Sequence, residues 1–513
     1  MHQISQTRPI VLTSDSDTKT EILREYADFW KIPYQLNSNL KGATIFATSN
    51  ALAPDESKNS PLIISPCGMN ESERIARDYG LSVSVKNALI SLPAAPGTEV
   101  SIRTDVHEFT GPAAEPILMS GDTQVLTKVR DSEVYLLSLD LIGEFSKRVY
   151  GGLEETPSWK FRMATRLPFS YSAIPRFVRE RSFRTKEGLG EILPEKLAPV
   201  ECLRILFLAS LVMSSGPIPR IGFWRRGKSY ALVVSHDVEG AYGLENGAAQ
   251  LLEVEHSLKI RSSWNLPSDR YPLSVQSLDK LKKSGEIGGH DTKHDGRLAF
   301  LTFSEKTQRL RECKDQLEKL TDQQVRGFRA PLLQHSQQLA ESAAKAGFEY
   351  DSSCPSWEIL SPTSLKPHGV GTIFPFEING ILEIPVSLPQ DHQLIRVAGQ
   401  RPSAAVDTLL RLSTWIRGLA GPCVLLVHPD YEFGVPENHP EYTRLLEGFS
   451  RDPECEIMTL GELSEWWKLR SKAQWRTSDE LPALPALAET REELRTELVT
   501  VYGSQGFTTE PLP

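Results

Sequence analysis

The sequence is poor in cysteine and has no excess of basic residues. Its 513 residues include six cysteines, all widely separated and none in a Cys-x-x-Cys pair, so the sequence indicates neither a zinc ribbon nor a disulfide framework. Isolated cysteines of this kind are typical of buried thiols in a reducing compartment. The net charge of −9 argues against a general nucleic-acid-binding protein, because such proteins are usually basic.

Long apolar runs are also absent. The longest apolar stretch, residues 202–213, contains Arg204 and is shorter than the roughly 20 residues that a membrane-spanning helix needs. The first nine residues lack the apolar core of a signal peptide. These absences predict a cytoplasmic protein, and they leave its oligomeric state open.

Residues 1–150 alternate between apolar runs and amphipathic stretches. Strands are predicted at 10–13, 43–48 and 62–65, and helices at 21–30 and 71–79. This alternation predicts a smaller α/β domain with a parallel sheet, followed by short antiparallel strands between 100 and 139 and a closing helix at 141–150. The pattern resembles the flavodoxin-like core of class I glutamine-amidotransferase-like domains. No Gly-x-Cys-x-Gly elbow surrounds Cys67, so we expect a buried thiol there and no amidotransferase activity.

Residues 151–228 are predicted to form a basic, aromatic helical connector. Between 160 and 186 the chain has eight lysines and arginines, few acidic residues and several interleaved aromatic rings. Such a segment is typical of a solvated stretch that packs its rings on a neighbouring domain, and it also suits peripheral contact with a membrane or an anionic glycan. A helix is predicted at 194–213, where an apolar run follows a proline and ends before Ser-Ser-Gly-Pro.

From residue 229 to about 472, predicted strands and helices alternate regularly. Polar side chains follow several of these strands. The apolar run at 230–234 ends near Asp237 and Glu239, which face the same side if the backbone stays extended. A later strand leads into His290 and His294. Their i, i+4 spacing predicts a helical turn with both rings on one face, as binding of one metal ion requires.

Further strand ends carry Arg329, Asp351, Asp391 and His428. Three of them have ordinary structural explanations: an ion pair for Arg329, a capping role for Asp351, and a satisfied core position for His428. Their joint occurrence after successive strands favours the active site of a β/α barrel, in which catalytic groups come from different strands. Leu426 lies two residues before His428 and therefore on the same side of its strand.

Five segments of residues 229–472 together resemble the polysaccharide deacetylases, the NodB-homology domains of carbohydrate esterase family four. They read Ser-His-Asp-Val-Glu at 235–239, His-Asp-Thr-Lys-His at 290–294, Arg-Ala-Pro-Leu at 329–332, Asp-Ser-Ser at 351–353 and Leu-Leu-Val-His at 425–428. The resemblance implies a distorted (β/α)7-type barrel. It also implies a metal-dependent hydrolase of carbohydrate metabolism that removes an N-acetyl group from a saccharide or its precursor, a carbon–nitrogen bond in a linear amide.

The resemblance also implies roles for individual residues. Asp237 acts as the general base, Arg329 holds it, His428 is the general acid and Asp391 orients that histidine. Glu239, His290 and His294 bind a divalent ion, with Zn²⁺ expected first and Co²⁺, Ni²⁺ or Mn²⁺ as alternatives. Substrate-binding positions are Leu332, Asp351, Trp357 and Leu426. Because Glu239 stands one residue beyond the family's usual aspartate, the two carboxylates can exchange roles.

Two other departures concern the substrate. Asp291 replaces the usual serine or threonine and is expected to add negative charge beside the ion, and Leu332 replaces an aromatic ring. Two alternative functions therefore stay open: an amidohydrolase acting on a non-sugar amide at the same metal site, and a barrel that binds a glycan without turning it over. Residues 473–513 are predicted to be a partly disordered tail.

Overall fold

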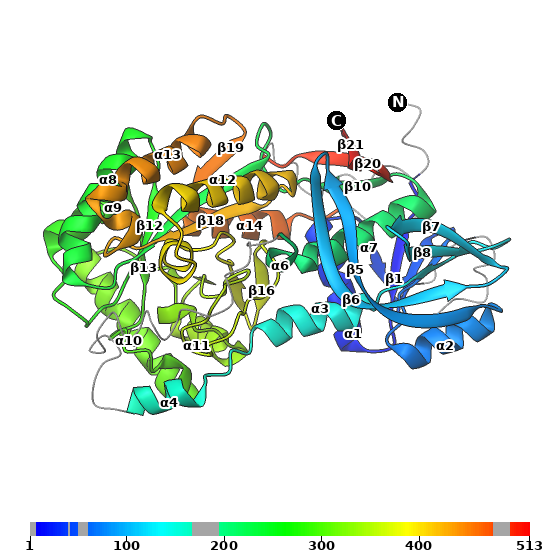
Figure 1. Ribbon diagram of the computed structural model, residues 1–513, viewed down its shortest axis with the longest axis horizontal. Coiled ribbons are helices and arrows are strands. Elements are labelled where there is room, and N and C mark those ends of the chain that lie inside the picture. The colour runs from blue at the N-terminus through cyan, green and yellow to red at the C-terminus, as the bar shows by residue number, and fades with distance from the viewer. Residues whose placement is uncertain (1–6, 39–41, 50–59, 167–193, 476–492, 513) are drawn as a thin grey trace. The chain divides into compact units, whose positions relative to one another are not determined.

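The structure is a computed structural model that describes residues 7–38, 42–49, 60–166, 194–475 and 493–512. The chain forms two compact units (Figure 1). The first comprises residues 1–149, 198–226 and 469–513, and the second comprises 150–197 and 227–468. The mixed α/β class predicted from the sequence is confirmed. The stretch predicted as one connector, 151–228, is shared between the units, with the break at residues 197 and 198.

The first unit contains a seven-stranded sheet with the strand order β2-β1-β3-β4-β9-β8-β7. Its elements are β1 Ile10–Thr13, α1 Asp17–Trp30, β2 Gln35–Leu36, β3 Thr44–Ala47, β4 Leu62–Ile64, α2 Met69–Asp78, β7 Ala114–Ser120, β8 Thr123–Val129, β9 Val134–Leu137 and α3 Leu141–Phe145. The strands from β2 to β9 in this order are parallel, and β8 and β7 are antiparallel. Burial raises the pKa of the Cys67 thiol to about 12, so it is protonated at neutral pH.

Two hairpins of the first unit differ from the predictions. Strands β5 Ser82–Ala95 and β6 Thr98–Thr110 form a long antiparallel hairpin, whereas only a short strand was expected near residue 100. Strands β20 Thr496–Gly503 and β21 Gly506–Pro511 form a second hairpin, and β20 also pairs with β10 Ile218–Ile221. The prediction of a disordered tail is therefore wrong for residues 493–512, and its remaining part at 476–492 lies outside the described residues.

The helix predicted at 194–213 is present as two helices, α6 Pro194–Leu197 and α7 Pro199–Ser215. Every residue of α7 from Pro199 to Val212 is buried, which explains why its sequence shows no polar face. Of the basic, aromatic stretch 160–186, the structure describes only the part in α4 Trp159–Arg166. The predicted membrane or glycan contact falls mainly on residues 167–186, which lie outside the described residues.

The second unit is built on parallel strands with the order β17-β15-β14-β13-β12-β11-β18, to which β16 adds antiparallel at one end. The strands are β11 Tyr230–Asp237, β12 Ser262–Leu266, β13 Gly285–Gly289, β14 Gly327–Phe328, β15 Tyr350–Asp351, β16 Phe376–Ile378, β17 Ile381–Glu383, β18 Pro422–Val427 and β19 Cys455–Met458. Strand β19 also pairs with β11, beside its first half. All eight residues of β11 are buried, as expected for a central parallel strand covered on both faces.

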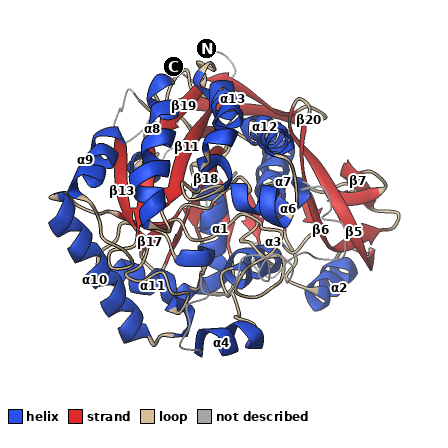
Figure 2. Cartoon of the chain, turned by 60° about the vertical axis from the view of Figure 1, so that its left-hand side comes forward, coloured by secondary structure: helices blue, strands red, loops and turns tan. Residues whose placement is uncertain are grey.

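Helices follow these strands along the chain and lie on the outside of the sheet (Figure 2). They are α8 Ala248–Ser257, α9 Val275–Ser284, α10 Phe303–Thr321, α11 Gln337–Ala346, α12 Pro402–Gly418, α13 His439–Ser450 and α14 Leu460–Lys472. The segment after β17 reaches β18, because Leu388 N donates to Val424 O at 3.2 Å and Ser387 Oγ donates to Pro422 O at 2.6 Å. The two ends of the parallel sheet are thereby joined.

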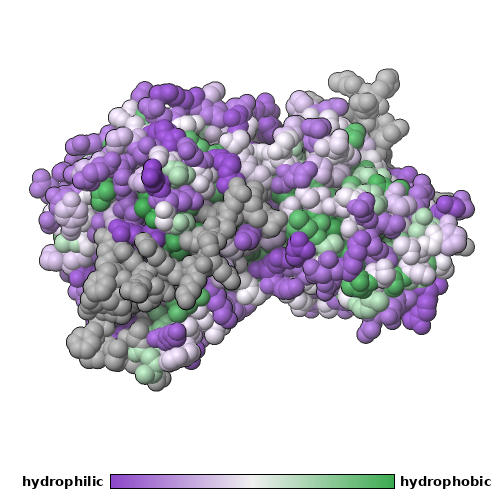
Figure 3. Space-filling view, viewed as in Figure 1, coloured by the Kyte–Doolittle hydropathy of each residue, from purple (hydrophilic) through white to green (hydrophobic). Residues whose placement is uncertain are grey.

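The surface shown in Figure 3 is mostly hydrophilic, with apolar residues in smaller areas between. Among the residues that the structure describes, none of the helices has the length and apolarity that crossing a bilayer demands.

Candidate active site

Asp237 lies at the end of β11 and accepts hydrogen bonds from one neutral amide and one cationic guanidinium. Its Oδ1 atom accepts hydrogen bonds from Asn265 Nδ2 at 2.9 Å and from Arg329 Nη1 at 3.2 Å. The side chain is almost completely buried. Burial alone would raise the pKa of Asp237, but electrostatic interactions with His290, Arg329 and His428 outweigh it and lower the pKa to about 2. The carboxylate is therefore ionised throughout the neutral range.

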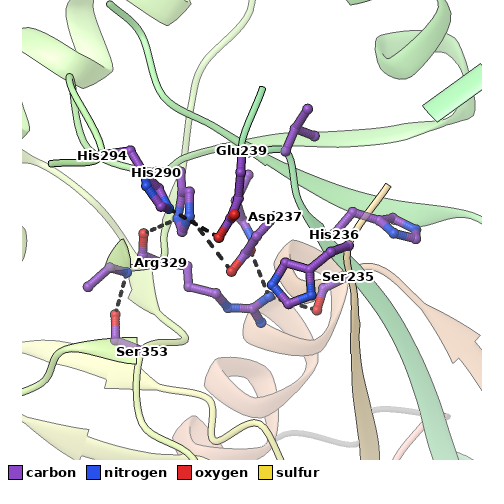
Figure 4. Close-up of polar contacts among 12 residues, drawn as sticks. Ser235, His236, Asp237, Glu239, His290, His294, Arg329 and Ser353 are labelled. Atoms are coloured by element: carbon purple, nitrogen blue, oxygen red, sulfur yellow. Dashed lines mark hydrogen bonds and ion pairs between the residues drawn. The ribbon is translucent and has the colours of Figure 1, made fainter. Parts of the chain in front are cut away.

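Arg329 makes three hydrogen bonds to two serines, besides its bond to Asp237. Its Nε donates to Ser352 O at 2.7 Å, Nη2 donates to Ser352 Oγ at 2.8 Å, and Nη1 donates to Ser235 Oγ at 2.9 Å. The side chain is fully buried. A buried guanidinium whose donors are all directed in this way keeps a single orientation, so it holds Asp237 at a fixed place (Figure 4).

The two histidines converge, but not on a helical turn as the spacing predicted. Asp291 and His294 have φ angles of 69° and 48°, in the left-handed region, so the backbone between the histidines is an irregular loop. The imidazole centroids of His290 and His294 are nevertheless 4.8 Å apart. The prediction of a helix was wrong, whereas the expected proximity of the two rings is present in the structure.

Each histidine faces a carboxylate (Figure 4). His290 Nδ1 lies 2.8 Å from the carbonyl oxygen of Arg329 and must donate to it, which leaves the lone pair on Nε2. That Nε2 atom lies 3.8 Å from Asp237 Oδ2, and His294 Nε2 lies 3.5 Å from Glu239 Oε1. The side chains thus bring two imidazole nitrogens and two carboxylates to one place, a donor set that suits a divalent transition-metal ion.

The surroundings of His294 both favour and oppose the binding of a metal ion. Its Nε2 is buried and has no hydrogen-bond partner within the described residues. Arg270 Nη1 lies 2.6 Å from both Nδ1 and the carbonyl oxygen of His294. Since a guanidinium only donates, neutral His294 carries its proton on Nε2. The residues fit a metal ion once Arg270 moves away from Nδ1. No pattern in the sequence indicated that Arg270 contacts this histidine.

Asp291 forms an ion pair with Arg309. Arg309 donates to Asp291 through Nε at 2.6 Å and through Nη2 at 2.5 Å, and its Nη1 and Nη2 also donate to Asp295. Asp291 Oδ2 also accepts the backbone N–H of His294 at 3.1 Å. The aspartate therefore shapes the loop that carries the second histidine, and its expected effect on the charge beside an ion stays a prediction.

His428 and Asp391 form a buried pair at the end of β18. His428 Nδ1 lies 2.8 Å from Asp391 Oδ1, and His428 N donates to Asp391 Oδ2 at 3.1 Å. The ring of Tyr431 stacks on the imidazole at a centroid distance of 4.6 Å. Burial opposes protonation of His428, but the charge and hydrogen bond of Asp391, with Glu239 and Asp237 beyond, raise its pKa to about 9.

Asp430 belongs to the same region and was not predicted. Its Oδ2 atom accepts the backbone N–H of Glu239 at 2.8 Å, which fixes the start of the loop after β11. Burial and the nearby charge of Glu239 raise the pKa of Asp430 to about 6. Asn265, which was not predicted either, lies in β12 directly beside Asp237 of β11.

The expected substrate-binding residues lie in different surroundings. Leu426 packs with Leu333 and Val386 in a small buried apolar cluster. Leu332 lies in the short turn Pro331–Leu333 and has a left-handed φ of 61°. Trp357 is partly buried with Lys196 Nζ 5.0 Å from its ring centroid. The substrate contacts of these three residues remain predictions.

Asp351 is fully buried, and burial raises its pKa to about 7. It accepts a hydrogen bond from Ser353 Oγ at 2.5 Å, and the same hydroxyl accepts the backbone N–H of Ala330 at 2.8 Å. Through this chain of bonds Asp351 supports the backbone beside Arg329.

No protein-family model and no curated protein matches the chain. Solved structures similar to it include a polysaccharide deacetylase from Mycobacterium smegmatis, with 18% identity over 52% of this chain and 98% of that chain and a TM-score of 0.42. An allantoinase shows 16% identity over 48% and 92% of the two chains and a TM-score of 0.38. A carbohydrate esterase family four pseudoenzyme from Bacillus anthracis shows 14% identity over 46% and 66%, with a TM-score of 0.32. Proteins of the family that the five segments resemble are thus among the structures similar to this chain.

Proposed function

We propose that the second unit is a metal-dependent hydrolase that removes an N-acetyl group from a saccharide or a saccharide precursor. One observation carries the proposal: Asp237, Glu239, His290 and His294 converge on one place, and Arg329 holds the first of them. The joining of the sheet's two ends through Leu388 N and Val424 O supports the distorted (β/α)7-type barrel expected for such an enzyme.

His290, His294 and Glu239 are the proposed ligands of a divalent ion, with Zn²⁺ first among the candidates. A divalent ion held there supplies polarisation of an acyl oxygen and a lowered pKa for water. His290 is oriented for this role, because its Nδ1–H donates to the carbonyl of Arg329 and leaves Nε2 available. Glu239 is partly exposed, with 27% of its side-chain surface accessible, so it can contact both ion and solvent.

Asp237 is the proposed acceptor of the proton that water loses when it attacks the acetyl carbon. Its Oδ1 atom is occupied by Asn265 and Arg329, so Oδ2 is the oxygen turned towards His290. The low pKa keeps this carboxylate ionised, and it also makes Asp237 a weak base. Direct binding of the ion by Asp237, with Glu239 as the base, is therefore the alternative assignment of the two carboxylates.

His428 is the proposed donor of the proton to the leaving amine. Its raised pKa of about 9 keeps it protonated at neutral pH. Asp391 fixes the ring, because its Oδ1 atom accepts a hydrogen bond from His428 Nδ1. Leu426, in the same strand, is proposed to contact the methyl group of the acetyl substrate. These roles require atoms of one substrate to reach β11 and β18, which are adjacent parallel strands.

Two alternatives each rest on a specific observation. Leu332 stands where the deacetylases have an aromatic ring, which favours a non-sugar amide substrate for the same hydrolytic site. Arg270 at His294 Nδ1 opposes metal binding, which favours a barrel that binds a glycan without turning it over. The six cysteines are all unpaired, which supports the proposed cytoplasmic location.

The test measures metal content and acetate release with the full-length protein. Wild type, His290→Ala and the control His256→Ala, which changes an exposed histidine on α8, are freed of metal, reconstituted with Zn²⁺ and incubated with N-acetylglucosamine oligomers. We expect acetate release by wild type and His256→Ala and none by His290→Ala. Zinc binding without acetate release would redirect the search to other linear amides. A wild type that binds no divalent ion at His290 would overturn the hydrolase and favour the binding barrel.

A further inference from the structure

A second group of metal-ligating side chains lies in the same unit and shares no residue with the site proposed for catalysis. Glu155, His335 and His368 each offer one donor atom, and these atoms all lie within 4.8 Å of one another. Glu155 precedes α4, His335 precedes α11, and His368 lies in the loop between β15 and β16. Since three distant parts of the chain supply the donors, their proximity results from the tertiary fold.

His368 has one nitrogen satisfied and one available. Its Nε2 lies 3.1 Å from Glu358 Oε2, so this nitrogen carries a proton and donates it to the carboxylate. Its Nδ1 is buried and has no hydrogen-bond partner in the described part of the chain, and it lies 4.0 Å from Glu155 Oε1. A histidine whose second nitrogen donates to a carboxylate is the usual arrangement of a metal ligand, because that bond fixes the ring and the tautomer.

His335 faces two acceptors with only one donor. Its Nδ1 lies 2.7 Å from Leu333 O, and its Nε2 lies 3.1 Å from Gly152 O. A neutral imidazole donates from only one nitrogen, and the ring of His335 is buried. If Nδ1 donates to the carbonyl oxygen of Leu333, the lone pair on Nε2 faces a lone pair on the carbonyl oxygen of Gly152, and the two repel each other. A cation bound between Nε2 and this oxygen would interact favourably with both.

Glu155 is the third donor and is only 3% exposed. Ser361 Oγ hydrogen-bonds its Oε1 atom, whereas Oε2 is buried and finds no partner among the residues described. A buried carboxylate oxygen without a donor costs free energy, because its hydration is lost and not replaced. An ion at this oxygen would supply the missing interaction.

We propose that Glu155, His335 and His368, with the carbonyl oxygen of Gly152, bind a structural zinc ion. Two imidazoles and a carboxylate with a fourth oxygen form a set that Zn²⁺ accepts in four-coordinate geometry. Tetrahedral donors about 2.1 Å from one zinc ion lie roughly 3.4 Å from one another, so donor atoms separated by up to 4.8 Å must approach by as much as about 1.4 Å. Four protein donors leave no open position, so this ion would stabilise the fold and take no part in catalysis.

The site would connect the segment before α4 to two loops near the proposed catalytic residues. His335 follows Leu333, which packs with Leu426 in the apolar cluster. His368 pairs through its backbone with Glu358, the neighbour of Trp357. Bound zinc would therefore restrain the loops that carry two of the predicted substrate-binding positions.

The test counts zinc in the full-length protein by mass spectrometry after removal of metal and reconstitution. Glu155→Gln removes the carboxylate, and Glu154→Gln is the matched control because it changes an adjacent, exposed glutamate. Both substitutions are made in wild type and in His290→Ala. We expect one zinc fewer with Glu155→Gln in either background and no change with Glu154→Gln. Equal zinc content in Glu155→Gln and Glu154→Gln would overturn the proposal.

The two sites are distinguishable by this design. If the catalytic site binds no metal, His290→Ala leaves the zinc content unchanged, whereas Glu155→Gln still lowers it. His368→Asn guards against a folding defect of the first variant, and far-ultraviolet circular dichroism establishes that each variant is folded. Cobalt substituted into His290→Ala provides a second readout: visible bands of four-coordinate Co²⁺ that His368→Asn abolishes support the site, and unchanged bands contradict it.

Discussion

At the scale of single residues, the pair His428–Asp391 has a pH dependence of defined sign. The pKa of His428 is raised to about 9 from an ordinary value of 6.5, so its favourable interactions stabilise the fold fully below pH 6.5 and are lost as the pH rises through 9. The shift corresponds to a stabilisation on the order of 3 kcal/mol. The same proton is the one proposed for the leaving amine.

Asp391→Asn is therefore expected to shift the alkaline limb of kcat/KM. Loss of the carboxylate removes the largest favourable charge at His428, so its pKa falls and activity declines at a pH lower by at least about one unit. Profiles of rate against pH for the variant and wild type measure this change. Asp407→Asn is the control, because Asp407 is exposed and pairs only with Arg444 among described partners. An unmoved alkaline limb would show that another group donates the proton.

Arg270 offers a second test at this scale. Arg270→Gln removes a positive charge and a donor from His294 Nδ1, which frees the ring to bind through Nε2. We expect the affinity for Zn²⁺ to rise by about tenfold, which is the effect of roughly 1.4 kcal/mol. Competition with a chromophoric chelator measures the affinity in the Glu155→Gln background, where only the catalytic site is proposed to remain. Weaker binding would mean that Arg270 mainly fixes the backbone of His294 through its carbonyl.

At the scale of elements, close backbone packing positions the end of β18. A methyl group on Gly247, beside α8, would lie 1.9 Å from the carbonyl oxygen of Pro429. That carbonyl follows His428 directly, so Gly247→Ala is expected to displace the proposed acid and to destabilise the fold by about 1–3 kcal/mol. Gly503→Ala is the control, because no atom lies within 4 Å of its added methyl group. Urea denaturation and kcat measure the two effects, and a Gly247→Ala enzyme equal to wild type contradicts the argument.

Elements of the second unit were predictable because buried parallel strands are continuous apolar runs bounded by glycine and polar residues. The apolar run at 230–234 lies within β11, and the strand expected before His290 is β13, which ends at Gly289. The hairpin β5–β6 was missed because many residues of β5 are exposed or partly exposed, so its sequence lacks a clear apolar face. Strand β20 was missed because its partner β10 lies far away in the sequence.

Part of the candidate site was predictable because several of its residues lie at the ends of predicted strands. Asp237, His290, Arg329 and His428 each follow a strand, and a shared rim of strand ends brings such residues together. Arg270 and Asp430 lie in loops whose paths depend on tertiary packing, and local sequence patterns carry no information about such paths. The helical turn expected for 290–294 was wrong because Asp291 bonds to Arg309 and to the His294 backbone, which stabilises a loop instead.

At the scale of the whole molecule, the division into two units predicts the effect of removing the C-terminal hairpin. Deletion of residues 494–513 takes away β20 and β21, including the buried residues Leu498, Val499 and Tyr502. We expect a lower unfolding temperature for the first unit and unchanged zinc content in the second. Calorimetry and metal analysis measure these quantities. Loss of zinc together with the hairpin would show that the two units do not fold separately.

The order of the chain through the two units affects how the protein is made. Residues 227–468 complete the second unit, whereas β20, the one described strand that pairs with β10, lies at residues 496–503. Helix α7 also contacts β20. During synthesis α7, which is buried from Pro199 to Val212 in the folded unit, therefore leaves the ribosome almost 300 residues before β20. The unit that begins first is the last to be finished, and while translation continues its incomplete core is a surface for chaperones to protect.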